Sequence, residues 1–151
     1  SFIAPRNGTP IYAYATDGGR RHHFYHDAND VPLALAPAWG FVSAEDPVWL
    51  ATVEFAFSPA NEGGHYARRL GSVHTPAPWP LGDIQELIIA QLQGDEGRAR
   101  RAQARLAAAA QWDGALPEAT APDSARVVSR HWFAWPNALL ACVARGVLMR
   151  P

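Results

Sequence analysis

Residues 26–41 read HDANDVPLALAPAWGF, and this stretch decides how the rest of the fold is interpreted. Asp27, Asn29 and Asp30 stand directly before a proline and an apolar run. Asn29 or Asp30 can cap the N-terminus of a helix, and proline suits the first helical turn. Because the run VPLALAPAWGF is apolar on nearly every side, we expect a helix that is buried on nearly every side and ends near Gly40.

Helical patterns continue on the C-terminal side of this stretch. A second start signal, SAEDP, places acidic residues in a first turn before Pro47. In a later helix, Asp83 and Glu86 share one face, and we expect that pair to be exposed to solvent. Pro136 either kinks the last helix or delays its start. The expected helices cover residues 48–57, 81–93, 98–112 and 131–148.

The remaining segments predict a hairpin and two long loops. Residues 10–27 predict a β-hairpin, because two aromatic-rich runs flank the turn residues Asp-Gly-Gly. Residues 60–80 and 113–126 predict long loops, which in a compact domain are usually functional. The expected fold class is therefore mainly α, with antiparallel helical hairpins whose short turns lie at one end and whose long loops lie at the other.

The composition limits the class of protein. A chain of 151 residues with 48% apolar residues is long enough for one domain with a sizeable core. A net charge of −1 gives no electrostatic basis for binding nucleic acid or an anionic membrane. No apolar run approaches the ~20 residues that span a bilayer. Cys142 is the one cysteine, so no internal disulfide can form, and we expect the reducing cytoplasm.

The histidines of the predicted hairpin do not indicate a metal site. In a strand, His22 and His26 share a face but lie about 13 Å apart, and His23 points to the opposite face. The sequence also lacks Gly-x-Ser-x-Gly, Cys-x-x-Cys and phosphate-loop motifs, so esterase, redox and nucleotide-binding functions have no support. We expect neither a metal nor a cofactor.

Polar and aromatic residues gather in three segments, HDANDVP, GSVHTPAPWP and GALPEATAPD. Glu118 lies in the third, between apolar residues and prolines. Such surroundings can tune a carboxylate for general-base chemistry. Alternatively, Glu118 caps a turn or pairs with an arginine such as Arg130.

Four stretches, in order along the chain, resemble the C-terminal third of the metal-independent exo-α-1,6-mannosidases of glycoside hydrolase family 125. They are YAYATDG (12–18), DANDVP with the following WGF (27–41), GSVHTPAPWPL (71–81) and RHWFAWPNALL (130–140). The resemblance implies part of an (α/α)6 toroid, with residues 1–151 as a single domain that is the C-terminal portion of a larger catalytic domain. It also implies carbohydrate as the partner.

The resemblance further implies roles for particular residues. Glu118 is implied as the general base, and Asp123 follows it at the family's spacing of five positions. The general acid is implied to lie upstream, outside this chain. The segment LPEA replaces the family's His and Ser around the base, which leaves the sugar open. The implied sugar contacts are His74, Trp79, Asp123, Arg130, Trp132 and Trp135, together with either Asp27 or the pair Asn29 and Asp30.

Three functions therefore remain. The first is part of an inverting, metal-independent, exo-α-mannosidase-like hydrolase. The second is a non-catalytic carbohydrate-binding or dimerising helical domain, and the third is an unrelated helical interaction domain. Because part of a toroid exposes apolar inner faces, we expect an upstream segment or a second copy of the chain to cover them.

Overall fold

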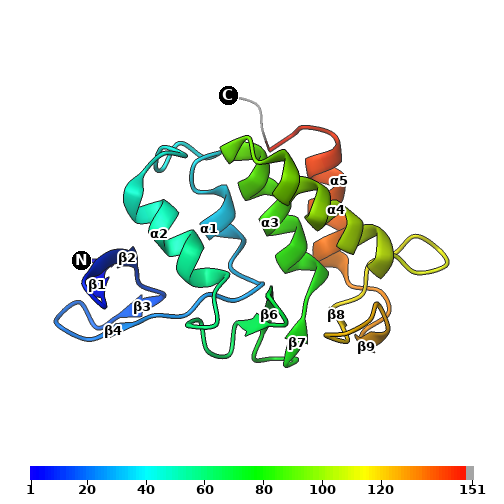
Figure 1. The fold of residues 1–151 in the computed structure, drawn as a ribbon, viewed down its shortest axis with the longest axis horizontal. Coiled ribbons are helices and arrows are strands. Elements are labelled where there is room, and N and C mark those ends of the chain that lie inside the picture. The colour runs from blue at the N-terminus through cyan, green and yellow to red at the C-terminus, as the bar shows by residue number, and fades with distance from the viewer. Residues whose placement is uncertain (149–151) are drawn as a thin grey trace.

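The computed structural model describes residues 1–148, which form a row of helices with small β-hairpins along its lower edge and at its N-terminal end (Figure 1). The helices in this range are α1 (Val31–Leu35), α2 (Pro47–Ala56), α3 (Pro80–Gln93), α4 (Glu96–Ala109) and α5 (Ala134–Ala144). The strands are β1 (Ile3–Arg6), β2 (Thr9–Tyr12), β3 (Ala15–Thr16), β4 (His22–His23), β5 (His65–Tyr66), β6 (Arg69–Ser72), β7 (Ala77–Pro78), β8 (Ala119–Thr120) and β9 (Val127–Ser129). Helices take 36% of the chain and strands 18%, so the fold is mixed α and β, and the prediction of a mainly α fold is only partly right.

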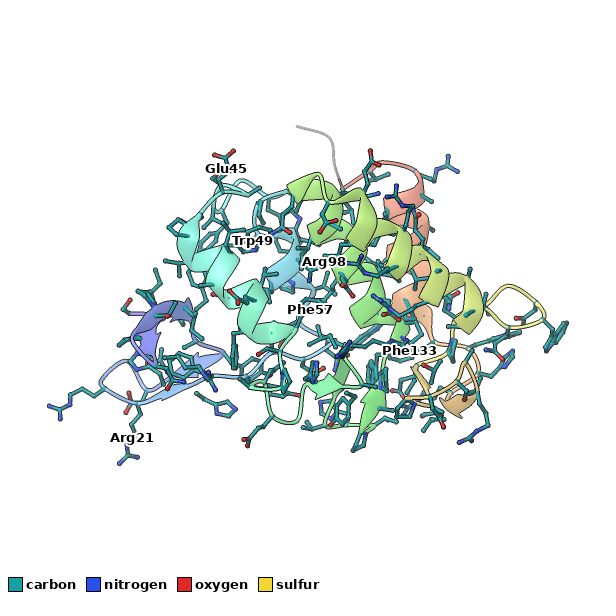
Figure 2. The ribbon with its side chains drawn as sticks, in the orientation of Figure 1. Arg21, Glu45, Trp49, Phe57, Arg98 and Phe133 are labelled. Atoms are coloured by element: carbon teal, nitrogen blue, oxygen red, sulfur yellow. The ribbon has the colours of Figure 1, made fainter. Side chains whose placement is uncertain are left out.

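Helix α1 is shorter than the sequence predicts. Pro37 has no amide hydrogen to extend the helix, and the carbonyl of Leu33 instead accepts the indole Nε1 of Trp49 at 2.8 Å. The chain continues through turns to Gly40, whose φ of 71° is left-handed. This hydrogen bond fixes α1 against α2, and Trp49 is fully buried between them (Figure 2).

The two helix starts differ in how they are capped. In α2 the side chain of Asp46 accepts the amide of Trp49 at 2.8 Å, as the SAEDP signal predicts. In α1, Asp30 takes the N-cap position, but its side chain makes no capping bond. Its Oδ2 accepts the amide of Asp27 at 2.9 Å, and its carbonyl accepts the amide of Leu33 at 3.0 Å. The prediction of a capping side chain at this start is therefore wrong.

Helix α3 lies at the centre of the core. It contacts α1, α4 and α5, and its residues Ile84, Ile88 and Ile89 are fully buried. Burial of such side chains contributes about 1.5–3 kcal/mol each. At the edge of this core the guanidinium of Arg98 lies 4.9 Å from the ring centroid of Phe57, which joins α4 to the end of α2 (Figure 2).

Asp83 and Glu86 of α3 lie in a network of ion pairs with arginines of α4 and β6. The side chain of Asp83 is 1% exposed and accepts Arg69 Nη2 at 2.5 Å and Arg105 Nε at 2.7 Å. Glu86 accepts Arg98 Nε at 3.0 Å and also pairs with Arg105. The prediction of a solvent-exposed pair is wrong, because the alanine-rich α4 packs against α3 and places its arginines over these acids.

The two predicted loops contain β structure. Residues 60–80 hold the antiparallel sheet β5-β6-β7, and residues 119–129 form the hairpin of β8 and β9. A Cβ added at Gly71 in β6 would lie 2.0 Å from the carbonyl oxygen of Ala77. Gly71 therefore permits the backbones of β6 and β7 to pack closely.

The structure differs from the sequence prediction at the N-terminal end of the chain and decides between two alternatives near the C-terminal end. A hairpin of β1 and β2 precedes the predicted one, and its turn residues Asn7 and Gly8 have φ of 50° and 84°. The predicted hairpin of residues 10–27 is present only over β3 and β4, because residues 10–12 belong to β2 and pair with β1 instead. Helix α5 begins at Ala134, so Pro136 lies in its first turn and the delayed start is the right alternative. None of the helices within residues 1–148 has the length and apolar character needed to cross a bilayer.

Candidate active site

The turn between β6 and β7 joins two buried carboxylates. Ser72 Oγ donates to Asp27 Oδ2 at 2.8 Å, and Thr75 Oγ1 donates to Glu118 Oε2 at 3.2 Å. His74 lies between them in the chain, is exposed, and donates its amide to Ser72 Oγ at 3.1 Å. One turn therefore connects three of the expected site residues, Asp27, His74 and Glu118.

Glu118 is 3% exposed and is held by hydroxyl and guanidinium donors. Its Oε2 accepts Ser129 Oγ at 2.5 Å as well as Thr75, and its Oε1 pairs with the guanidinium of Arg130. Burial by itself raises the pKa of Glu118, but the hydrogen bonds from Ser129 and Arg130 outweigh it and hold that pKa below its ordinary value. Glu118 is therefore ionised at neutral pH and able to accept a proton.

The backbone around Glu118 is fixed by the segment that leads into α5. The amide of Glu118 donates to the carbonyl of Arg130 at 3.0 Å, and the side chain of Asn137 exchanges hydrogen bonds of 2.9 Å with the backbone of Leu116. Arg130 has a φ of 42°, a left-handed conformation that costs a non-glycine residue about 1 kcal/mol or more. Its side chain is 62% exposed, so Arg130 lies on the solvent side of Glu118.

Asp27 anchors a second cluster. It is 3% exposed, and its Oδ1 accepts both the amide and the side-chain nitrogen of Asn29 at 2.9 Å. Its Oδ2 accepts the phenol of Tyr25 in addition to Ser72. Both carboxylate oxygens of Asp27 are bonded within the protein, so Asp27 orders the loop before α1. The polar groups that remain free to bind a ligand belong to its neighbours.

Asp30 lies at the edge of a cavity of about 420 Å³ beside this cluster. Burial is the main cause that raises the pKa of Asp30, to about 6, and the charge of Asp27 adds to it. Asp30 is therefore partly protonated near neutral pH. The cavity has the size of a small-molecule pocket. Its walls are Tyr14, His23, Tyr25, Asp27, Asn29, Asp30, Glu62, Val73 and His74.

A larger cavity of about 780 Å³ lies on the other side of Asp30, against α1 and α2. Its walls are mainly apolar, and they include Trp39, Phe41 and the buried ring of His26. Burial lowers the pKa of His26 to about 4, so the ring is neutral. Because this cavity includes neither Asp27 nor His74, which the β6–β7 turn connects to Glu118, whereas the smaller cavity includes both, we place the candidate site at the smaller one.

Trp79 and Asp123 lie apart from the open site. Trp79 is 2% exposed, and its Nε1 donates to the carbonyl of Thr75 at 3.0 Å. Its ring packs edge-on against the ring of Phe133, with 5.7 Å between the two centroids. It supports the β6–β7 turn from inside. Asp123 is exposed between β8 and β9, and within residues 1–148 it makes no hydrogen bond or ion pair, Glu118 included.

Trp132 and Trp135 follow Arg130 along the chain and lie at the surface. Their exposed fractions are 69% and 55%. The structure thus brings Glu118 and Arg130 together and, through the β6–β7 turn, connects them to the cluster around Asp27. The two indoles lie beyond Arg130, where they are open to solvent.

The hydroxyl residues that hold the carboxylates were not among the candidates predicted from the sequence. Ser72 and Thr75 flank His74, and Ser129 directly precedes Arg130. Each lies within two positions of a residue already singled out, and hydroxyl groups are common donors to buried carboxylates. Their position beside the candidates was therefore the available signal.

The histidines expected not to bind a metal lie in and after β4. Among the described residues, no three His, Cys, Asp or Glu side chains are placed to hold a metal ion together. His22 and His23 pair with β3, while His26 is buried against Phe55.

A match to a family model decides what the chain is related to. Residues 2–144 match the model of a family described as metal-independent alpha-mannosidase (GH125). The chain belongs to this family. The resemblance of the four sequence stretches to family 125 is therefore confirmed.

Two proteins illustrate the relationship. The chain is 28% identical over 148 residues to the meiotically up-regulated gene 157 protein of Schizosaccharomyces pombe, covering 93% of this chain and 28% of that protein. It is also similar to a metal-independent α-mannosidase of Streptococcus pneumoniae in a non-productive complex with α-1,6-mannobiose, with a TM-score of 0.81 and 27% identity over 99% of this chain. The chain spans 36% of that mannosidase, so it corresponds to only part of the length of both relatives.

Proposed function

We propose that this chain is the base-bearing, C-terminal portion of an inverting exo-α-mannosidase built on an (α/α)6 toroid. The observation that carries the proposal is the environment of Glu118. It is a buried carboxylate whose donors keep it ionised, and it lies in a hairpin tied to a polar cavity through the β6–β7 turn. Family membership supports an α-mannoside as the substrate class.

An inverting enzyme uses two carboxyl groups on opposite sides of the glycosidic bond, about 6.5–9.5 Å apart. One protonates the leaving oxygen, and the other removes a proton from the attacking water. We assign the second role to Glu118. The general acid then belongs to a part of the protein outside these residues.

The hydrogen bonds of Glu118 indicate which oxygen receives the proton. Within residues 1–148, Oε2 already accepts two hydroxyl donors, from Thr75 and Ser129, whereas Oε1 accepts Arg130 alone. Oε1 therefore keeps an open acceptor site, and it faces the exposed side chain of Arg130. In this proposal the attacking water binds to Oε1 beside Arg130, and the cluster around Asp27 binds the sugar.

The test is hydrolysis of α-1,6-mannobiose by the protein as its source organism makes it. Glu118→Gln should lower kcat by roughly 10²–10⁴-fold, while Glu54→Gln, a change of the same kind on the exposed face of α2, should leave kcat unchanged. Nuclear magnetic resonance of the first product should show the β-anomer. A Glu118→Gln variant with full activity, or an α-anomer as first product, refutes the proposal.

The exposed indoles of Trp132 and Trp135 favour one alternative, carbohydrate binding without hydrolysis. A second copy of the chain or an upstream segment would then cover the apolar surface. Binding of α-1,6-mannobiose with no hydrolysis by the natural protein would select this alternative.

A further inference from the structure

A second group of aromatic residues lies outside the candidate site. It consists of Trp112, Asp113, His131 and Trp132, which we name the outer aromatic cluster. Trp112 and Asp113 come from the loop after α4, and His131 and Trp132 come from the segment between β9 and α5. None of them binds to Glu118 or to its donors.

The rings of this cluster follow one another across the surface. The centroid of His131 lies 6.5 Å from that of Trp112, with 29° between their planes. It lies 6.2 Å from that of Trp132, with 41° between those planes. Trp112 is 90% exposed and Trp132 is 69% exposed, so the faces of both indoles are open.

The cluster is held in place by one carboxylate. Asp113 Oδ2 accepts Trp132 Nε1 at 2.6 Å and lies 3.4 Å from His131 Nε2. Its other oxygen, Oδ1, accepts the amide of Ala115 at 3.0 Å. The rings of His131 and Trp132 are therefore positioned before any ligand arrives, which lowers the entropic cost of binding.

The combination of groups points to a sugar rather than a protein surface as the occupant. The cores of protein interfaces are depleted of charged residues, whereas here an ionisable acid and a histidine lie among the rings. Sugars offer flat apolar faces that stack on indoles and hydroxyl groups that bond to carboxylates and imidazoles.

The cluster begins where the Glu118 site ends. Ser129 and Arg130 contact Glu118, and the next two residues, His131 and Trp132, contact Asp113. An oligosaccharide that reaches Glu118 with one residue can thus extend over the indoles with the next. We propose that the outer aromatic cluster is an accessory carbohydrate-binding site for a part of the substrate beyond the bond that is cleaved. This inference rests on the proposed role of Glu118, because that role defines which bond is cleaved. The stacking of a sugar on the indoles does not depend on it.

The test measures binding of α-1,6-linked mannotriose by calorimetry to the natural protein carrying Glu118→Gln, which prevents turnover. Adding Trp112→Ala should weaken binding by roughly fivefold, and Trp112→Phe should restore most of the loss. The control is Trp39→Ala, which removes another exposed indole, 60% exposed, from the turns that follow α1. Binding of α-1,6-mannobiose should change less than binding of mannotriose.

Equal affinities for mannotriose with and without Trp112→Ala would overturn the inference, and so would an equal loss from Trp39→Ala. The outcome is separable from that of the proposed function. Hydrolysis by the unmodified protein tests Glu118, whereas these titrations test the indole, so either result can fail alone.

Discussion

Replacing Asp83 by Asn tests whether the buried ion pairs between α3 and α4 hold the fold together. The carboxylate is 1% exposed and accepts Arg69 Nε at 3.2 Å, Arg69 Nη2 at 2.5 Å and Arg105 Nε at 2.7 Å. Asn has nearly the same shape but no charge, so Arg69 loses the carboxylate it pairs with and Arg105 keeps only Glu86. Breaking a buried pair in this way costs about 3–5 kcal/mol, and because Asn keeps one acceptor oxygen we expect about 3 kcal/mol.

The assay is urea unfolding of the natural protein followed by circular dichroism, with Glu96→Gln as the matched control. Glu96 pairs with Arg100 on the surface, where the side chains are 83% and 70% exposed, so its loss should cost less than about 0.5 kcal/mol. Asp83→Asn should lower the unfolding midpoint with little change in the slope. If the two variants unfold at the same urea concentration, the argument that burial makes this network stabilising is wrong.

Three further predictions concern single side chains. Ser129→Ala removes a hydrogen-bond donor to Glu118, and we expect it to raise the pKa of that carboxyl group. The acidic limb of the pH profile of hydrolysis should therefore move to higher pH. An unmoved limb would show that Ser129 does not affect the pKa of Glu118. Burial raises the pKa of Asp30 from 3.8 to about 6, so its contribution to stability is present below pH 4 and lost as pH rises through 6. Asp30→Asn should therefore gain about 1 kcal/mol relative to the wild type between pH 4 and 7 in urea titrations, and a constant difference across that range would contradict this. Gly71→Ala places a Cβ 2.0 Å from a carbonyl oxygen and should lower the melting temperature by several degrees. The control is Gly97→Ala, whose Cβ would meet nothing closer than 3.4 Å, and it should leave the melting temperature unchanged or raise it.

The sequence predicts those features that depend on neighbouring residues. Helices α2, α3 and α4 follow from periodicity and from the signal at Asp46, with ends that differ from the expected ones by a few residues. The strands of the β5-β6-β7 sheet have two to four residues each, which is too few for an alternating pattern to stand out. The buried state of Asp83 depends on an arginine from β6 and another from α4, so no local pattern could reveal it.

In the candidate site, too, local features could be predicted from the sequence and long-range contacts could not. Glu118 was identifiable because its apolar, proline-bounded segment and the family resemblance agreed. Its donors Thr75 and Ser129 stand 43 and 11 positions away in the sequence, and only the folded chain brings them to the carboxylate. The resemblance implied Trp79 as a sugar contact, whereas the structure buries its side chain beneath the turn.

The turn from Ser72 to Thr75 gives two distant carboxylates a shared support. Asp27 is bonded to one end of the turn and Glu118 to the other, so the backbone torsions of four residues set how far apart their hydroxyl donors lie. Lengthening or shortening the turn by one residue would therefore displace a donor of each carboxylate in a single step, although Asn137 of α5 would still hold the backbone before Glu118.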